Sequence, residues 1–438
     1  MVTNRIEHMF DELAAVDVFV DEAALVARLA VLETAKAAAA AGQARVTAVL
    51  DAKRRAAEAA AGVPAAKRGR GLAGEVALAR RDSPNRGGRH LGFARALVHE
   101  MPCTLQALSC GAISEWRATL IVRESAGLTV EHRRQLDAEL CSDLSRLQGW
   151  GDKRVEVEAR KIAYRLDARA VVERAAKSAS DRTVSVRPAP DCMTYVTALL
   201  PVAQGVAVYA ALKRAADTTF DKRGRGQIMA DTLYERVTGH PAAAPVPVTV
   251  HLALSGETLL GGDDRPADMP GYGPIPAGVA RALIADAATG ERSRAVLRRL
   301  YTRPATGALV AMESRSRFFP KGLARLIDLR DGTCRTPYCD APIRHRDHAQ
   351  PHYRGGRTSL TNGLGECERC NYAKEAPGWQ VTTREDNGIH TAEFITPTGA
   401  RYTSTAPPAP GHRDVFVRKP ERRIRCSATS ARHRPLRT

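Results

Sequence analysis

Four of the nine cysteines in this chain fall within 37 residues, and they form two pairs with the spacing of metal-binding knuckles. Cys334 and Cys339 have four residues between them, and Cys367 and Cys370 have two. Two such pairs can close a tetrahedral thiolate site for Zn²⁺. A small, loop-rich module around them has little apolar material, so bound zinc would contribute to its folding free energy. We therefore predict a structural zinc site made of these four cysteines.

Residues that could activate water for hydrolysis stand between and beside the two pairs. In the tandem Asp347-His348, the carboxylate could hold a hard divalent cation, and the imidazole could take a proton from water near neutral pH. Asn362 lies between the pairs. Asn371 directly follows Cys370, and a helix beginning near there would fix it beside a zinc ligand. Taken singly, each is more often an ordinary surface or turn residue, so the case rests on their combination.

A competing interpretation uses three histidines of the same segment. On a helix, His345, His348 and His352 would share a face and could form a three-histidine metal site. Pro342 and Pro351 oppose a continuous helix there, because proline removes a backbone donor and clashes with the preceding turn.

Taken in order along the chain, Cys-x4-Cys, Asp-His, Asn and Cys-x2-Cys-Asn-x2-Lys resemble the HNH endonuclease module, a ββα-metal fold. The flanking segments CRTPYCDAP, GWQV and TPTGARY are similar to HNH domains of a large bacterial family. In that family the module follows a helical domain of unknown function, DUF222, which this chain also resembles. The segments similar to it are GAISEWRATLIVRESAGLT, MTYVTALLPVAQGVAVYAAL and GYGPIP. The resemblance extends from about residue 25 to 402.

The resemblance implies a metal-dependent endonuclease that hydrolyses DNA phosphodiester bonds. His348 would be the general base for the attacking water, Asp347 would ligate a catalytic Mg²⁺ or Mn²⁺, and Asn362 would orient the loop around His348. Asn371 stands where many members carry a second histidine, and its carbonyl oxygen can still be offered to the metal. The four cysteines match the structural zinc positions. The candidates for phosphate contacts are Arg335, Arg344, Arg346, Arg354, Arg357 and Lys374.

Two other classes of function stay open. Asn371 could instead mark a zinc-stabilised nucleic-acid-binding protein with weak or lost nuclease activity. The helical region could also bind a protein partner, whose identity the sequence does not give. The sequence contains no P-loop GKS or GKT, no HExxH and no nucleophile elbow, which leaves NTPase, zincin and α/β-hydrolase functions without support.

The charge balance favours a polyanionic partner such as DNA. The 438 residues carry a formal net charge of +18, with 66 Lys and Arg against 48 Asp and Glu. Residues 401–438 hold ten basic and two acidic residues, a net charge of +8. Aromatic residues make up only 5%, so we expect an aliphatic core.

The sequence also predicts a cytoplasmic protein with no membrane partner. Its acidic, amphipathic start differs from a signal peptide. The uncharged stretch 192–212 contains Pro201 and several polar residues, so we interpret it as a strand followed by a helix. Nine scattered or clustered cysteines are too few for a secreted disulfide scaffold of this length.

These observations predict an α+β protein with a mainly helical N-terminal region, a few short strands and a small zinc-stabilised ββα-metal module. We divide the chain into a helical region at 1–175 and a mixed α/β continuation of the same domain at 176–318. The HNH module follows at 319–402, and a basic, disordered tail at 403–438.

Finer patterns give further expectations. Leu25, Leu29 and Leu32 recur at helical spacing and predict a buried helix face. The segment 62–89, rich in glycine, proline and basic residues, predicts a flexible break. The remaining predicted elements are two short strands around the turn 188–191, a helix over 201–216, a strand over 248–254, a loop over 261–276 and a helix over 277–288.

Overall fold

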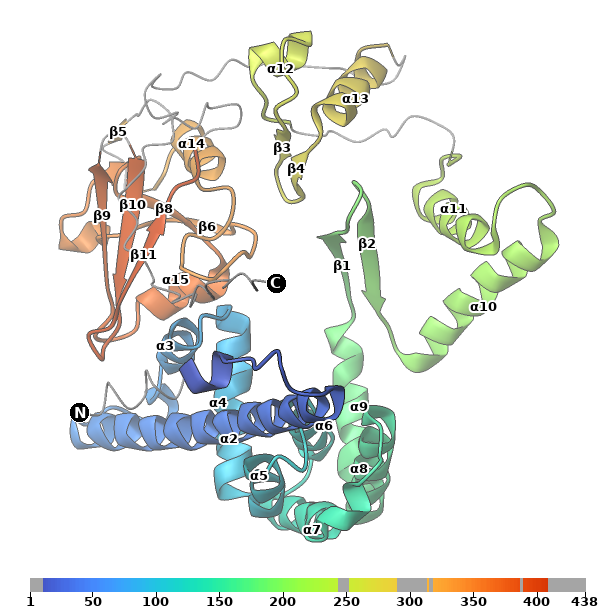
Figure 1. Ribbon diagram of the computed structural model, residues 1–438. Coiled ribbons are helices and arrows are strands. Elements are labelled where there is room, and N and C mark those ends of the chain that lie inside the picture. The colour runs from blue at the N-terminus through green and yellow to red at the C-terminus, as the bar shows by residue number, and fades with distance from the viewer. Residues whose placement is uncertain (1–10, 243–251, 290–312, 315–317, 387–388, 409–438) are drawn as a thin grey trace, which may run out of the picture.

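The computed structural model describes residues 11–242, 252–289, 313–314, 318–386 and 389–408. Within these ranges the protein is mainly helical with a few short antiparallel strands, which confirms the predicted α+β class. Figure 1 shows a bundle built along one long helix, a middle region of small hairpins and helices, and a C-terminal module beside the bundle.

The helical region is organised along α2 (Glu22–Ala60), whose N-cap residue Asp21 accepts a hydrogen bond from the amide of Ala24. Its core is aliphatic, with Leu97, Leu108 and Leu136 fully buried. Alanines on one face of α2 let the neighbouring helices approach closely. The other helices of this region are α3 (Leu72–Ala79), α4 (Pro84–His99), α5 (Pro102–Ser109), α6 (Glu115–Ser125), α7 (Val130–Cys141), α8 (Asp152–Leu166) and α9 (Ala168–Ser178).

Two expectations for this region are wrong. Leu25 and Leu29 do not form a buried face, since 38% and 67% of their surfaces are exposed. The buried residues of α2 begin only at Ala37, where the other helices first cover it. The predicted break at 62–89 is also much shorter, because α3 lies inside it and α4 begins with Pro84. A proline in the first helical turn starts a helix rather than breaking one.

The middle region contains the two predicted strands and the predicted helix after Pro201. Strand β1 (Thr183–Pro188) pairs antiparallel with β2 (Thr194–Leu199). Helices α10 (Val202–Thr218) and α11 (Arg225–Thr238) follow. Every residue of both strands is exposed, so this hairpin contributes nothing to the core.

A second hairpin replaces the loop that the sequence predicted at 261–276. After α12 (Gly256–Leu260), β3 (Ala267–Met269) pairs with β4 (Gly273–Ile275), and α13 (Ala277–Thr289) follows as predicted. The strands escape sequence analysis because each has only three residues. Of the strand predicted at 248–254, residues 248–251 lie outside the described residues, and Ala253 forms an isolated bridge to Asp268.

The C-terminal module contains two antiparallel strands followed directly by a helix, the ββα order. These are β6 (His345–His348), β8 (Gly363–Glu366) and α15 (Glu368–Lys374). Helix α14 (Lys321–Asp331) precedes them. The module also has the short pair β5 (Glu313–Ser314) and β7 (Thr358–Ser359), and the sheet of β9 (Gln380–Asp386), β10 (Ile389–Ile395) and β11 (Arg401–Thr405) with order β11-β10-β9.

The predicted end of this module at residue 402 is slightly early. Strand β11 continues to Thr405, and the amide of Ala406 still donates to the carbonyl of His390. Residues 409–438, which make up most of the predicted tail, lie outside the described residues.

A buried network of charges joins the parts of the module. The carboxylate of Asp331 is fully buried and accepts hydrogen bonds from Arg330, from Arg335 and from the amide of Gly365. Arg335 also donates to the backbone carbonyl of Ser404, at 2.7 Å. Burial raises the pKa of Asp331, but the two arginines and the amide outweigh it, and the net shift is downward. The network therefore ties the end of α14 to β8 and β11.

The module packs against helices α3 and α4 of the helical region. Leu78 joins Ala376 and Trp379 in one buried cluster. Glu75 is buried and accepts a hydrogen bond from the amide of Thr398, at 3.1 Å. A Cβ added at Gly71 would lie 2.7 Å from both Ala376 Cβ and Trp379 Nε1. Position 71 requires glycine for two reasons: there is no space for a Cβ atom, and the backbone has a positive φ of 81°.

We predict that Gly71→Ala lowers the thermal unfolding midpoint of the full chain more than Gly149→Ala does. Both glycines have positive φ, so alanine causes backbone strain in both variants. A Cβ at position 149, however, has nothing within 4 Å. The crowding at Gly71 adds an overpacking cost of about 1–3 kcal/mol. Thermal melts followed by circular dichroism measure the difference, and equal shifts for the two variants would exclude the close contact.

The stability of the module should depend on pH through His390. Burial, together with the charge of Arg330, lowers the pKa of His390 to about 4. The unfolded chain takes up this proton below about pH 6.5 while the native chain stays neutral, so stability falls as the pH drops from there toward 4. The His390 contribution amounts to roughly 1 kcal/mol lost between about pH 7.5 and 6.

Urea unfolding at both pH values compares the wild type with His390→Gln, which can still donate to the carbonyl of Thr361 that His390 contacts at 2.8 Å. We expect the variant to lose less stability on acidification than the wild type. Identical losses would show that His390 titrates normally in the native state.

Candidate metal centre and active site

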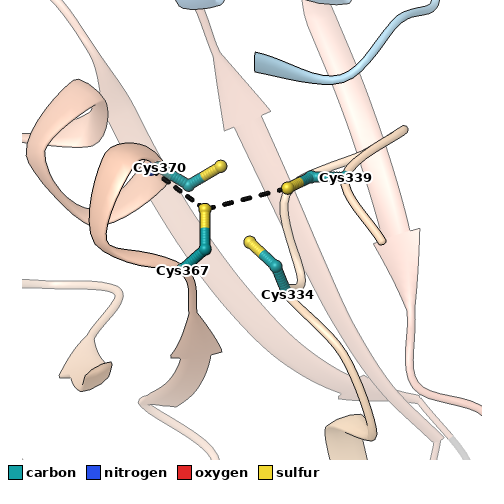
Figure 2. Close-up of side chains that lie close together, drawn as sticks. All are labelled: Cys334, Cys339, Cys367 and Cys370. Carbon is teal, nitrogen blue, oxygen red and sulfur yellow. Dashed lines mark hydrogen bonds between the residues drawn. The ribbon is translucent and has the colours of Figure 1, made fainter. Parts of the chain in front are cut away.

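The structure brings the four predicted cysteines together. Cys334 and Cys339 come from the loop after α14, and Cys367 and Cys370 from the start of α15 (Figure 2). Their Sγ atoms all lie within 4.8 Å of one another. The Sγ atoms of Cys339 and Cys367 are 3.8 Å apart.

This geometry fits a tetrahedral zinc site. With Zn–S bonds of about 2.3 Å, the sulfur atoms of such a site are about 3.8 Å apart. Hydrogen bonding to Cys334 lowers the pKa of the Cys367 thiol and raises the pKa of the Cys370 thiol, so the four thiols do not ionise alike by themselves. A divalent cation would favour the thiolate form of all four.

The local backbone holds each pair of cysteines in place. In the first pair, the amide of Cys334 donates to the carbonyl of Ala341, and the amide of Cys339 donates to Thr336. Tyr338 turns this loop with a left-handed φ of 62°. In the second pair, Cys367 is the N-cap of α15, and its Sγ accepts a hydrogen bond from the amide of Cys370. Both loops are therefore shaped to direct the thiols toward one centre.

Asp347 and His348 lie on β6, which pairs with β8 directly before the cysteine helix. The His348 side chain is buried, its Nε2 lies 2.9 Å from Thr358 Oγ1, and its ring packs on Phe319 at 4.6 Å between centroids. Burial lowers the pKa of His348, against the opposing effect of Asp347. The imidazole is therefore neutral at neutral pH and able to accept a proton.

Asp347 is held by the end of α15. Its Oδ2 accepts a hydrogen bond of 2.8 Å from Lys374 Nζ, and its Oδ1 accepts one from the amide of His348. Burial raises the pKa of Asp347, but the hydrogen bond and charge of Lys374 outweigh it and the net shift is downward. The carboxylate stays ionised and able to hold a cation.

Glu366 is a second carboxylate beside Lys374. It lies at the end of β8 with no exposed surface, and its Oε2 is 3.8 Å from Lys374 Nζ. Neither carboxylate oxygen has a hydrogen-bond partner among the described residues. Burial raises the pKa of Glu366 well above its usual range, and the charge of Lys374 offsets this only in part. Such a group is costly in a protein interior.

The two asparagines occupy different positions in the site. Asn362 closes the loop after β6: its Oδ1 accepts from the amide of Gln350, and its Nδ2 donates to the carbonyls of Gln350 and Arg357. Asn371 lies on α15, which begins at Cys367 as expected. Its Oδ1 is buried without a hydrogen-bond partner in the described part of the chain.

The three-histidine site is not formed. Residues 345–348 form a strand rather than a helix, so His345 and His348 project from opposite faces of β6. In the described residues, the group of metal-ligating side chains that converges is the four cysteines.

The six candidates for phosphate contacts divide into three groups. Arg335 is buried in the network of Asp331, and Lys374 is buried beside Asp347, so neither is on the surface. Arg346 makes two 2.6 Å hydrogen bonds to Asp328. The exposed members of the set are Arg344, Arg354 and Arg357.

Sequence reasoning missed two residues of the site. Thr358, which contacts His348, is a small polar residue in a segment with no motif of its own. Glu366 directly precedes Cys367, and a carboxylate in a strand before a metal-binding knuckle is the one signal that could have singled it out.

The comparison with family models identifies the part of the chain that precedes the four clustered cysteines. A model described as a domain of unknown function, DUF222, matches residues 26–331, more than half of the chain. The chain belongs to the DUF222 family. No curated protein and no solved structure matches it. The DUF222 match ends at Asp331, the last residue of α14, so the cysteines and the Asp347-His348 pair lie beyond it.

Among the described residues, no helix combines the length and the apolar character that crossing a membrane requires.

We predict that the purified protein holds about one Zn²⁺ per chain and that Cys370→Ser loses it together with part of its thermal stability. Cys339 and Cys367 also line a hollow of about 230 Å³. Cys192→Ser is the matched control, since Cys192 is an exposed free thiol. Metal analysis by mass spectrometry gives the zinc content. An unchanged content in Cys370→Ser would rule out the four-cysteine site.

Proposed function

We propose that this protein is a metal-dependent HNH-type endonuclease that hydrolyses DNA phosphodiester bonds. The observation that carries the proposal is the ββα unit of β6, β8 and α15. It places the Asp347-His348 pair on one strand and starts its helix at the cysteine cluster. The order of these residues along the chain and their support in space agree with the resemblance to HNH modules.

In this proposal Asp347 and Asn371 would supply oxygen ligands to a hard divalent cation, Mg²⁺ or Mn²⁺. Asp347 is an ionised carboxylate, and the Oδ1 of Asn371 is a buried acceptor without a hydrogen-bond partner among the described residues. Both are ligand types that these ions prefer. When bound, the ion would stabilise the charge that develops on the scissile phosphate and the leaving oxygen.

His348 would act as the general base. The contact with Thr358 fixes Nε2, and Nδ1 lies on the side of Asp347, at 3.6 Å from its Oδ1. Nδ1 is therefore the nitrogen placed to take the proton of an attacking water next to the carboxylate. Asn362 keeps the following loop closed and so holds the end of β6 in position.

DNA would be attracted by the surplus of positive charge, and the exposed Arg344, Arg354 and Arg357 would contact phosphates from the same module. Such contacts position the backbone without reading its sequence.

We expect the full-length protein to cleave supercoiled plasmid in the presence of Mg²⁺ or Mn²⁺ and not in EDTA. His348→Ala should reduce the rate by about 10²–10⁴-fold, because a general base contributes that much. His99→Ala is the matched control, since His99 is exposed at the end of α4, outside the module. Agarose gels of nicked and linear product follow the reaction.

Cleavage by His348→Ala at the wild-type rate would contradict the assigned base. A wild type that binds DNA with a steep dependence on salt but never cuts it would instead favour the nucleic-acid-binding protein without nuclease activity. Failure to bind DNA at low salt would point to a protein partner.

A further inference from the structure

Lys374 is a buried cation at the place where the proposed catalytic ion would bind. Only 3% of its side chain is exposed, and its Nζ lies 2.8 Å from Asp347 Oδ2 and 2.9 Å from Glu375 Oε1. The Oδ2 atom of Asp347 therefore already has a positive partner. A divalent ion ligated by this carboxylate would meet the ammonium group of Lys374 at short range and be repelled by it.

Glu366 offers Lys374 a second position. Its Oε2 is 3.8 Å from Lys374 Nζ, too long for a hydrogen bond, and both of its oxygens lack a hydrogen-bond partner among the described residues. A shift of about 1 Å would bring the ammonium group within hydrogen-bond distance of this carboxyl group. The flexible four-carbon stem of lysine permits such a shift without movement of the helix backbone.

We propose that Lys374 is a tethered cation that occupies Asp347 in the absence of a divalent ion and moves to Glu366 when the ion binds. The inference rests on the proposed function, because it concerns the catalytic ion of that site. Lys374 and Glu366 are positioning residues in this scheme, since they set the affinity of Asp347 for the ion without ligating it.

The arrangement explains two features that the endonuclease proposal leaves unexplained. A buried carboxyl group without a hydrogen bond is unfavourable, and Glu366 gains one only when Lys374 turns to it. A lysine paired with the metal-binding carboxylate would otherwise only block the site. With Glu366 and Lys374 arranged in this way, ion binding at Asp347 exchanges the ammonium group of Lys374 for the divalent ion.

The test is the affinity for Mn²⁺ in the absence of DNA, measured from the electron paramagnetic resonance signal of free Mn²⁺ with the zinc-loaded full chain. We expect Lys374→Met to bind Mn²⁺ about tenfold or more tightly than the wild type, since a charge-assisted hydrogen bond to Asp347 no longer competes. Glu366→Leu should bind it more weakly, because Lys374 loses its second position. Lys321→Met, at an exposed position of α14, is the control for the loss of one charge and should leave the affinity unchanged.

The double variant Glu366→Leu/Lys374→Met separates this role from a structural one. If Glu366 acts only through Lys374, the double variant should bind Mn²⁺ as tightly as Lys374→Met alone. It also removes both buried charges together, so it remains informative if Lys374→Met fails to fold with Glu366 left unpaired. Zinc content and circular dichroism confirm that each variant is folded.

Unchanged or weaker Mn²⁺ binding in folded Lys374→Met, or an effect of Glu366→Leu that persists without Lys374, would overturn the inference. The plasmid assay is read separately. If the wild type never cuts DNA but the Mn²⁺ affinities change as expected, the inference stands and the endonuclease does not. If it cuts and the affinities do not change, the endonuclease stands and the tethered cation is excluded.

Discussion

The antiparallel pairing of β6 with β8 is the constraint on which the candidate site depends. Its register sets His348 opposite Gly363 and His345 opposite Glu366. Because side chains alternate between the faces of a strand, a slip of one residue would turn Asp347 and His348 to the wrong sides. The same pairing fixes where β8 ends, and therefore where Cys367 begins α15. One ladder of four residue pairs thus positions both the cysteine cluster and the residues proposed to act on DNA.

Buried charges stabilise this pairing and make it specific. The carboxylate of Asp331 accepts hydrogen bonds from two arginines and from the amide of Gly365 on β8. Its charge is therefore neutralised and its oxygen atoms are hydrogen-bonded. Removing a single partner of such a network leaves an unpaired charge in the interior, which costs far more than the network gains over apolar packing. Glu366 lacks this compensation. This contrast between the two buried carboxyl groups is the reason for proposing that Glu366 acts together with Lys374.

The DUF222 region and the C-terminal module form a continuous contact. Gly71 and Gly74 on the side of α3 leave room for Trp379, while Glu75 hydrogen-bonds the turn at Thr398. Arg369 of the cysteine helix reaches across to Asn85 at the start of α4, at 2.8 Å. The helical region therefore supports the helix that carries the cysteines. Since these contacts involve α15 itself, changes in α3 and α4 can act on the site without touching its chemistry.

Sequence alone determined the features that depend on neighbours along the chain. The clustering of the two cysteine pairs, the helices α10 and α13, and the strands β1 and β2 follow from local sequence patterns, and the structure contains each of them. The position of Asn371 next to a cysteine of the cluster, at the start of a helix, belongs to the same class. Local spacing is enough here because turns, helix starts and knuckles are built by residues a few positions apart.

Only the tertiary structure decided which side chains are buried and which partners neutralise the buried charges. Leu25 and Leu29 have a core pattern but are exposed, while Arg335 and Lys374 have the character of surface residues and are buried. Lys374 meets Asp347 across 27 residues of sequence, and Arg335 meets His390 across 55. Burial and charge pairing depend on such distant partners, and no local pattern records them. The sequence could therefore name Asp347 and His348 as candidates, but the contact of Thr358 with His348 and the burial of Glu366 near Lys374 are visible only in the folded chain.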